Sequence, residues 1–475
     1  MSYRLGIDVG GTNTDAVLLD DQDRVLAKAK TPNSEDIIAG IDQVVRTVLS
    51  QGKIQPEDIH YVMLGTTQVT NAIIERRGLS RVGILRLGAP ATMAIPPLAA
   101  WPRDLVAKVE GPVAFLPGGV EYDGRAITAF DEKAVREAVE KMAPEVEAFA
   151  VTSVFAPVKD EDELRAAEII QEVVGEHSMV SISSQVGSIG FLERENATIL
   201  NAAVTALARA VTGAFARALS DLGIQASIYL AQNDGTLMSL DYALRYPILT
   251  IASGPTNSIR GAAYLTGLQD AIVVDVGGTS TDVGILVGGF PRESSAAAEI
   301  GGVRTNFRMP DLISIGLGGG SRVRKEGDDL QVGPDSVGSH IVQEALSFGG
   351  STLTMTDVVV ALGRYSLGTV APRVDRDIAE NAQGRAKAMA EEAIDRIKTS
   401  AEAMPVIVVG GGSIILPDNL EGAKEVLRPP HFEVANAIGA AIAQVSGTID
   451  RIFSMENRAR QEVLDEARQL AFDNA

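Results

Sequence analysis

Two short segments of the chain repeat the same arrangement of acidic, glycine and hydroxyl residues. Residues 8–19 read DVGGTNTDAVLL and residues 275–286 read DVGGTSTDVGIL, so eight of twelve aligned positions are identical. In each copy an apolar run contains an aspartate near its end, Asp8 or Asp275, and a single valine separates it from Gly-Gly. Packing gives little reason for a carboxylate there, whereas carboxylates hold Mg²⁺ or orient an attacking group. We therefore predict that both aspartates are catalytic residues and metal ligands.

The residues after each aspartate are suited to binding phosphate. Glycines let phosphate oxygens approach main-chain N–H groups, and short polar side chains add hydrogen-bond donors. Two such hairpins facing each other would clamp a triphosphate, and neither a P-loop motif nor a G-x-G-x-x-G after a strand is present. ATP with Mg²⁺ is therefore the predicted cofactor. The predicted phosphate-binding residues are Gly10, Gly11, Thr12, Asn13 and Thr14, together with Gly277, Gly278, Thr279, Ser280 and Thr281.

Two glycine clusters follow in the second half of the chain. IGLGGGSRV (315–323) contributes Gly318 and Gly319 to the predicted cofactor site. VIVVGGGSIILP (406–417) is an apolar strand running into glycines, and such bare backbone suits a flat ligand such as adenine or ribose. We expect this second cluster to contact the nucleoside rather than the phosphates. Its predicted cofactor-binding residues are Gly410, Gly411, Gly412 and Ser413.

Other polar residues allow both a structural and a functional interpretation. Asp15 and Asp282 either hold their hairpin turns or belong to the site. Ordinary helix capping accounts for at least one member of the group Thr66, Thr67 and Asn71, at the end of a strand. Arg194 is either a clamp for a substrate carboxylate or part of an ion pair. The single tryptophan, Trp101, is expected to be structural.

The elements that must position these residues alternate between strands and helices. Each hairpin has an apolar strand on both sides, and the first continues in the order ββαβαβ, which fits a mixed sheet covered by helices. The duplication predicts an α/β protein with the two-lobed actin-like (ribonuclease H-like) fold, in which duplicated mixed-sheet domains enclose an ATP cleft. We place the lobes at residues 1–223 and 224–475, with an insertion at about 88–145. ANAIGAAIA (435–443) predicts a helix of small residues packed closely between the lobes.

Composition excludes several classes of function. The 475 residues include no cysteine, which excludes disulfides, thiol nucleophiles and cysteine-bound clusters. The formal net charge is −20, without a basic block that could neutralise nucleic acid. The first residues, MSYRLGIDVGG, contain no apolar stretch of signal-peptide length, and longer apolar runs are interrupted. We expect no nucleic-acid or membrane partner and a cytoplasmic location.

Taken together, these motifs resemble the hydantoinase A and 5-oxoprolinase family of the actin, Hsp70 and sugar-kinase superfamily. LGIDVGGTNTD and GTTQVTNAIIERRG resemble its opening motifs, and DVGGTSTDVG, IGLGGGS and ANAIGAA its later ones. The resemblance implies ATP-dependent opening of a cyclic amide such as a hydantoin, 5-oxoproline or lactam, in which ATP activates the amide oxygen before water attacks. Some relatives instead activate ketones for carboxylation. A small-molecule kinase and a non-metabolic actin-like ATPase remain alternatives.

The sequence also departs from the family pattern. HIVQEALSFGGSTLTMTD follows VGPDSVGS in place of the usual Pro-Gly-Pro and Cys-Tyr-Gly stretch, AQNDG replaces a Ser-Asn-Gly-Gly pattern, and SGPTNS replaces a Gly-Pro-Ala variant. Longer relatives continue into a further C-terminal domain, so this chain resembles a short form. We therefore expect a second subunit of hydantoinase B type as partner.

Overall fold

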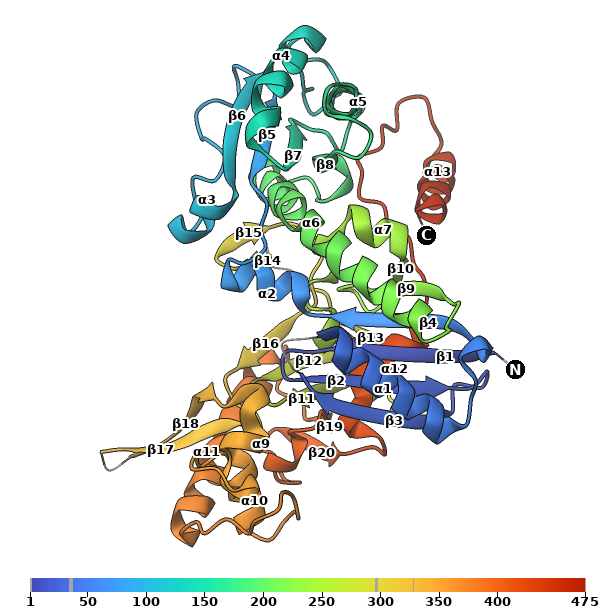
Figure 1. Ribbon diagram of the computed structural model, residues 1–475. Helices are drawn as coiled ribbons and strands as arrows, with labels where there is room; N and C mark the ends of the chain where they lie inside the picture. Colours follow the sequence, from blue (N-terminus) through green and yellow to red (C-terminus); the bar gives the residue numbers. More distant parts are fainter. Residues whose placement is uncertain (1, 34–36, 295–297, 328, 475) are drawn as a thin grey trace.

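The computed structural model describes residues 2–33, 37–294, 298–327 and 329–474 (Figure 1). Its first sheet has six strands with β1 and β4 at the centre, parallel to each other. Helix α1 (Ile37–Gly52) packs on this sheet through an apolar face that includes Ile41, Val44 and Val48. In spatial order the strands are β10 (Leu237–Ser239), β9 (Ser227–Ala231), β4 (Ile59–Thr66), β1 (Tyr3–Val9), β2 (Asn13–Leu19) and β3 (Val25–Pro32).

The second sheet repeats this plan. β11 pairs antiparallel with β12 and parallel with β19, as β1 pairs with β2 and β4. Helices α10 (Met355–Ala361) and α11 (Arg376–Ile397) cover one face through a shared apolar core. The duplicated mixed sheets expected from the sequence are therefore confirmed. The strands are β11 (Ala271–Val276), β12 (Thr281–Val287), β13 (Phe290–Pro291), β16 (Leu312–Ile315), β19 (Met404–Val409) and β20 (Ala423–Leu427).

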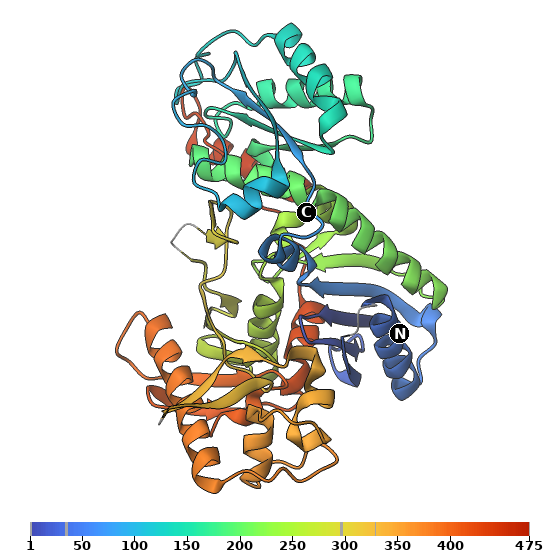
Figure 2. The same cartoon turned by 60° about the vertical axis from the view of Figure 1, so that its left-hand side comes forward.

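A third sheet forms a separate layer at the far end from the second lobe in Figures 1 and 2. This part of the chain spans more residues than the insertion expected at 88–145, because strands from both sides of that range belong to the third sheet. Its core is shared with α4 (Glu132–Met142) and α5 (Glu161–Val174). The strands are β6 (Glu110–Leu116), β5 (Val82–Leu87), β7 (Ala148–Ser153) and β8 (Met179–Ile182).

The first lobe also extends beyond the expected boundary at residue 223. β9 lies after that boundary, yet it pairs with β4 from Tyr61↔Ser227 to Leu64↔Leu230. Its apolar residues complete the buried face of the first sheet, which is why the chain returns to that sheet before it enters the second lobe. The division between the sheets therefore falls after β10, in the segment that contains α7 (Leu240–Arg245) and α8 (Ser253–Thr266).

Two helices of small residues lie between the lobes. α8 packs on the second sheet and α12 (Ala435–Ile442) on the first, and the two helices pack against each other. A Cβ at Gly261 would lie 1.9 Å from the Ala435 carbonyl oxygen, and one at Gly439 1.8 Å from that of Asn257. Larger side chains cannot occupy this contact, so the predicted interlobe helix of small residues is confirmed.

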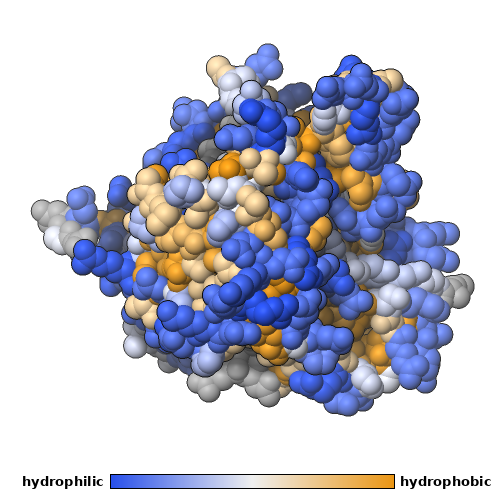
Figure 3. Space-filling view, turned by 90° about the horizontal axis from the view of Figure 1, so that it is seen from above, coloured by the Kyte–Doolittle hydropathy of each residue, from blue (hydrophilic) through white to orange (hydrophobic). Residues whose placement is uncertain are grey.

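The remaining elements are short or lie at the surface, except for the long helix α6 (Phe191–Asp221). This helix is long and apolar enough to cross a membrane, but more than half of its most apolar stretch is buried against other elements, as in a core helix. The surface seen from above is largely hydrophilic, with orange areas between blue ones (Figure 3). The other elements are α2 (Gln68–Glu75), α3 (Arg103–Val109), α9 (Ile341–Glu344), α13 (Arg460–Asp473), β14 (Ala298–Ile300), β15 (Val303–Thr305), β17 (Ser321–Glu326) and β18 (Asp329–Ser336).

Candidate nucleotide and catalytic site

The two repeated hairpins lie against each other across the lobes. The hydroxyl oxygens of Thr12 and Thr279 are 3.4 Å apart, although 267 residues separate them. A Cβ at Gly278 would lie 2.8 Å from the Thr12 side chain, so glycine is required for this approach. The structure therefore brings together the two segments that the sequence predicts to share one ligand.

Each hairpin is closed in the same way. The N–H of Gly10 donates to the Asn13 carbonyl at 3.0 Å, and that of Gly277 donates to the Ser280 carbonyl at 2.9 Å. In contrast, a Cβ at Gly11 would meet no atom within 4 Å. Packing therefore does not explain that glycine, and the open space over its backbone is what an approaching phosphate needs.

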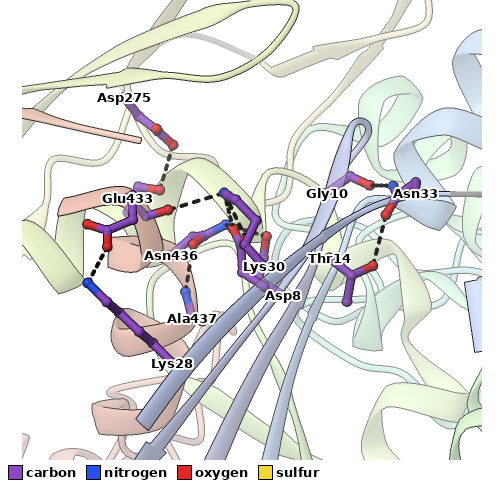
Figure 4. Close-up of polar contacts among 12 residues, drawn as sticks. Asp8, Gly10, Thr14, Lys28, Lys30, Asn33, Asp275, Glu433, Asn436 and Ala437 are labelled. Carbon is purple, nitrogen blue, oxygen red and sulfur yellow. Dashed lines mark hydrogen bonds and ion pairs between the residues drawn. The ribbon is translucent and has the colours of Figure 1, made fainter. Parts of the chain in front are cut away.

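Asp8 is buried at the end of β1, with 2% of its surface exposed. Its neighbour on β4 is Gly65, where a Cβ would lie 2.2 Å from Asp8 Oδ1. Asn436, on α12, donates from Nδ2 to Asp8 Oδ2 at 2.8 Å and to Asp15 Oδ2 at 3.0 Å (Figure 4). Asp8 Oδ1 has no hydrogen-bond partner among the described residues. One amide thus joins two carboxyl groups, while one carboxyl oxygen stays unbonded.

The surroundings of Asp8 favour its neutral form. Burial raises its pKa to about 7, and the nearby carboxyl groups of Asp15 and Asp275 add to this effect. The hydrogen bond from Asn436 and the charge of Lys30 act in the opposite direction. Such a carboxyl group changes charge close to neutral pH, which suits a proton acceptor better than an ordinary surface aspartate.

Lys30 connects the two lobes beside these carboxyl groups. From β3 its Nζ lies 2.7 Å from Asp15 Oδ1 and donates to the carbonyl oxygen of Glu433 at 3.2 Å (Figure 4). Glu433, just before α12, also pairs with Lys28. A Cβ at Gly411 would lie 3.6 Å from Lys30 Nζ, so this ammonium group also reaches the second glycine cluster.

Asp275 occupies the equivalent position in the second lobe. It lies at the end of β11 and accepts a hydrogen bond from Ser258 Oγ, on α8, at 2.6 Å. Gly410 has a φ of +84°, and its Cβ would lie 2.2 Å from Asp275 Oδ1. Burial raises the pKa of Asp275. Each aspartate therefore lies over a glycine at the end of the neighbouring parallel strand. Each also accepts a hydrogen bond from a side chain of α8 or α12, the two helices between the lobes.

Asp282 and Asp15 face different surroundings. Burial raises the pKa of Asp282 to about 6, and Ser314 donates to its carboxylate, so it is fixed within the second sheet. Asp15 contacts both Asn436 and Lys30 and belongs to the cluster around Asp8. Asn33 supports the first hairpin by donating to the Gly10 carbonyl at 2.6 Å.

The glycine clusters pack on the second hairpin. Gly319 N–H donates to the Gly277 carbonyl at 3.0 Å, and Gly318 lies so close that its Cβ would be 2.6 Å from the Gly278 carbonyl carbon. Gly412 N–H donates to the Val276 carbonyl at 2.8 Å, and Ser413 is fully buried. Gly411 is the member of its cluster with the most space above it.

Two residues with alternative interpretations are structural. Arg194 is fully buried and donates to Ser183 Oγ at 2.9 Å and to the carbonyl oxygens of Ser153, Ser188 and Ile189. Its donors are used within the protein, so it is neither a substrate clamp nor a surface ion pair. Trp101 is buried and donates from Nε1 to Asn196 at 2.8 Å, as expected for packing.

The group at the end of β4 supports the first hairpin. Thr67 donates from its backbone N–H to the Val9 carbonyl at 3.2 Å, Asn71 Nδ2 lies 3.4 Å from Thr67 Oγ1, and Thr66 Oγ1 accepts from Gln68 N–H at 3.3 Å. Thr67 is the N-cap residue of α2, but its side chain makes no capping hydrogen bond, and Thr66 instead satisfies the first backbone donor of the helix from the position before the cap.

Sequence reasoning did not single out Lys30, Gly65, Ser258 or Asn436, although three of them lie in segments that it quoted. Asn257 was also missed: both polar atoms of its fully buried side chain lack a partner among the described residues, and the Cβ position over Gly65 lies 2.7 Å from its Nδ2. The internal similarity of NSIRGAA and NAIGAA was the available signal for Asn257 and Asn436.

Comparisons with known proteins place this arrangement in a family. The model of the hydantoinase/oxoprolinase N-terminal region matches residues 4–174, and the hydantoinase/oxoprolinase model matches residues 194–368. The acetophenone carboxylase gamma subunit of Aromatoleum aromaticum is 28% identical over 397 residues, which are 76% of this chain and 53% of that protein. The caprolactamase subunit alpha of Pseudomonas jessenii is 26% identical over 491 residues, 95% of this chain and 67% of that protein.

Further similarities show the fold and the difference in length. The chain spans 31% of 5-oxoprolinase 1 of Arabidopsis thaliana, at 26% identity. The ATP-dependent caprolactamase structure from Pseudomonas jessenii matches with a TM-score of 0.77 at 22% identity, covering 99% of this chain and 76% of that one. An acetone carboxylase structure matches with a TM-score of 0.71 at 19% identity over the same shares. With two matched family models and a shared two-lobed actin-like fold, the chain belongs to the hydantoinase/oxoprolinase family.

Proposed function

We propose that this protein is an ATP-dependent hydrolase, or the ATP-binding subunit of one, that opens a cyclic amide. The observation that carries the proposal is that the two hairpins contact each other across the lobes. Beside each hairpin an aspartate occupies the space that a glycine leaves at the end of the neighbouring strand. Relatives named caprolactamase and 5-oxoprolinase support a cyclic amide as substrate. An amide carbonyl is a poor electrophile, and phosphorylation of its oxygen by ATP would make the carbon more reactive toward water.

The proposed reaction has three steps. The amide oxygen attacks the γ-phosphorus of ATP and the bond to ADP breaks, which leaves a phosphorylated amide. Water then attacks the former carbonyl carbon, and cleavage of the C–N bond opens the ring and leaves an acyl phosphate. A second water releases inorganic phosphate and the free carboxylate. The backbone around Gly11 and Gly278 would position the phosphates, because alignment is the main contribution of a protein to phosphoryl transfer. Asp8, with its pKa of about 7, is the proposed acceptor of the proton from water.

Asp8 and Asp275 are the residues that would hold Mg²⁺. Their chemistry fits, since hard carboxylate oxygens suit this ion, and Asp8 Oδ1 is a buried oxygen without a partner among the described residues. The described residues contain no group of three or more metal-ligating side chains, which agrees with an ion bound mainly by water and substrate phosphates. When bound, Mg²⁺ would neutralise the charge that develops on the phosphates.

We also propose that a second polypeptide of hydantoinase B type completes the enzyme. Two relatives are named as subunits, alpha in caprolactamase and gamma in acetophenone carboxylase, which supports assembly with other chains. The partner would exclude bulk water from the activated substrate. Complete ring opening by the purified chain alone, stoichiometric with ATP, would contradict this part of the proposal.

The deciding experiment measures ATP turnover with hydantoins, lactams and 5-oxoproline, recording free phosphate and ring-opened product together. Equal amounts of both products are expected. A stable phosphorylated product without free phosphate would instead identify a small-molecule kinase. ATP hydrolysis that no substrate stimulates would identify a non-metabolic ATPase. Because one relative is a carboxylase subunit, ATP turnover should also be measured with a ketone and bicarbonate.

A further inference from the structure

A cavity of about 200 Å³ lies where three parts of the molecule meet. Its walls come from the connection between β8 and α6 (184–188), the β9–β10 turn (232–234), residues 306–308 and the segment 448–451. Clefts between separately folded parts are the usual location of small-molecule sites, and those for drug-sized ligands measure about 300–1,000 Å³. This smaller cavity therefore suits a single small ring rather than a nucleotide.

The cavity lies beside the proposed nucleotide site. β1, β4 and β9 are parallel neighbours, so the turn after β9 and the hairpin after β1 leave the same edge of the sheet. Two strand spacings place these ends about 10 Å apart. The hydroxyl of Thr256 donates to the Asn233 carbonyl at 3.1 Å and links the cavity wall to α8, directly before Asn257. A ligand in the cavity would lie next to the hairpins without occupying them.

The polar lining includes three side-chain amides that each have one half still unbonded. Gln232 and Asn233, 6% and 4% exposed, donate from their amide nitrogens to the carbonyl oxygens of Leu237 and Arg308. Gln185 accepts from Tyr246 Oη. In the described part of the chain, no hydrogen bond is made by the amide oxygens of the first two or by the amide nitrogen of the third. The cavity thus combines free acceptors with a free donor.

The charged groups of the lining favour a neutral ligand. Arg308 pairs with Glu293 at 3.4 Å, and Arg451 pairs with Asp160. Asp234 and Asp450 also line the cavity, so within the described residues no unpaired arginine or lysine faces it. A carboxylate ligand would compete with Glu293 and Asp160 for these arginines and would be repelled by Asp234 and Asp450. Tyr242, Tyr246 and Leu249 provide an apolar wall for methylene groups.

We propose that this cavity binds the ring of a neutral cyclic amide, such as a lactam or hydantoin, as the substrate of the proposed reaction. A ring holds its amide in the cis form, so N–H and C=O point to the same side. The N–H would donate to the amide oxygen of Asn233 or Gln232, and the C=O would accept from Gln185 Nε2. The inference rests on the proposed function and narrows its substrate class, because 5-oxoproline carries a carboxylate.

The test uses Gln185→Glu, which keeps the shape and the acceptor for Tyr246 but replaces the free donor by an acidic oxygen. Gln171→Glu, the same change on α5 outside the cavity, is the control. Binding of ε-caprolactam, hydantoin and 5-oxoproline is measured by calorimetry on the full chain, with and without a non-hydrolysable ATP analogue. Asn233→Ala provides a second variant, and unfolding temperatures check the fold of each.

We expect the two neutral rings to bind at least tenfold more tightly than 5-oxoproline. Gln185→Glu and Asn233→Ala should weaken that binding about tenfold, the effect of one lost hydrogen bond, and leave nucleotide affinity within twofold. Unchanged lactam binding in both variants, tighter binding of 5-oxoproline, or no binding of either neutral ring would overturn the assignment. Measurement of turnover separates this proposal from the proposed function. If the variants do not change turnover, the cavity is not the substrate site, although the proposed function can still hold. If the rings bind but are never opened, the proposed function is wrong, although the cavity still binds them.

Discussion

Replacing Asp8 with asparagine should make the protein more stable at pH 8 while abolishing turnover. Asp8 is buried, and its pKa is raised from the ordinary value of 3.8 to about 7, mainly by burial. That difference corresponds to about 4 kcal/mol of preference for the neutral form in the folded protein. An asparagine of the same shape does not ionise, and its side chain can still accept from Asn436. The substitution therefore removes the penalty of a buried charge.

The sign of the pH dependence follows from proton binding. Between about pH 4 and pH 7 the folded protein holds this proton and the unfolded chain does not, so the contribution of Asp8 to stability falls as pH rises. At pH 5 Asp8 is neutral in the folded protein but ionised in most unfolded chains, so the variant should already be more stable by about 1.6 kcal/mol, and the two proteins should have similar stability only below about pH 4. At pH 8 the variant should be more stable by up to about 4 kcal/mol, or about 4 °C in Tm for a cooperative chain of this length.

Thermal unfolding at pH 5, 6, 7 and 8 measures this effect, with ATP turnover recorded on the same samples. Asp20→Asn is the control of opposite sign, since hydrogen bonding to Arg24 lowers the pKa of Asp20, and that variant should lose stability at pH 8. The reasoning is refuted if Asp8→Asn is less stable than the parent at pH 8, or if the difference in Tm does not change between pH 5 and pH 8.

Three further predictions test the neighbours of this carboxyl group. Asp275→Asn should lower kcat for ATP turnover by about 100-fold or more with the fold retained, and wild-type activity would remove Asp275 from the site. Gly411→Val should raise KM for ATP more than it lowers kcat, since its Cβ would lie 3.6 Å from Lys30, a distance that the fold accepts. Gly410→Val would instead meet Asp275 and should lose activity. Equal effects of the two substitutions would contradict the assignment of Gly411 to the nucleoside. Lys30→Met should move the acidic limb of the pH–rate profile to higher pH, because Lys30 lowers the pKa of Asp8 and Asp275, and an unmoved limb would exclude that role.

The repeat in the sequence was sufficient to predict the duplicated sheets and the meeting of the hairpins. In both copies the strand ends with aspartate and valine directly before Gly-Gly, and the mainly local contacts of a hairpin make such a pattern readable. The boundaries were less predictable. β9 returns to the first sheet after the long helix α6, and the parallel pairing of β9 with β4 reveals this return only in the structure. Strand order depends on long-range packing, which a single sequence does not display.

The partners of the aspartates were unpredictable for the same reason. Asn436 lies 428 residues from Asp8, and Lys30 reaches Asp15 from a strand that the sequence identifies only by its alternation. Arg194 shows the converse case. Its position among polar residues suggested a ligand or an ion pair, but the connection after β8 wraps around the guanidinium and supplies backbone carbonyls. Whether a polar side chain is free for chemistry is decided by neighbours that are distant in sequence.

The two lobes share one frame, and their differences divide the roles of the two aspartates. In each lobe a glycine leaves room for the carboxyl group, and a side chain of α8 or α12 donates a hydrogen bond to it. Asp8 accepts from the Asn436 amide, which also donates to Asp15, whereas Asp275 accepts from the hydroxyl of Ser258. The charge of Asp15 opposes the ionisation of both aspartates, but Asp8 shares the Asn436 amide with Asp15, whereas Asp275 accepts from a separate hydroxyl group. Two carboxyl groups in different surroundings are what a site needs to combine proton transfer with the binding of a cation. We therefore propose that the two aspartates, both of which would hold the cation, differ in proton transfer, for which Asp8 is the better placed.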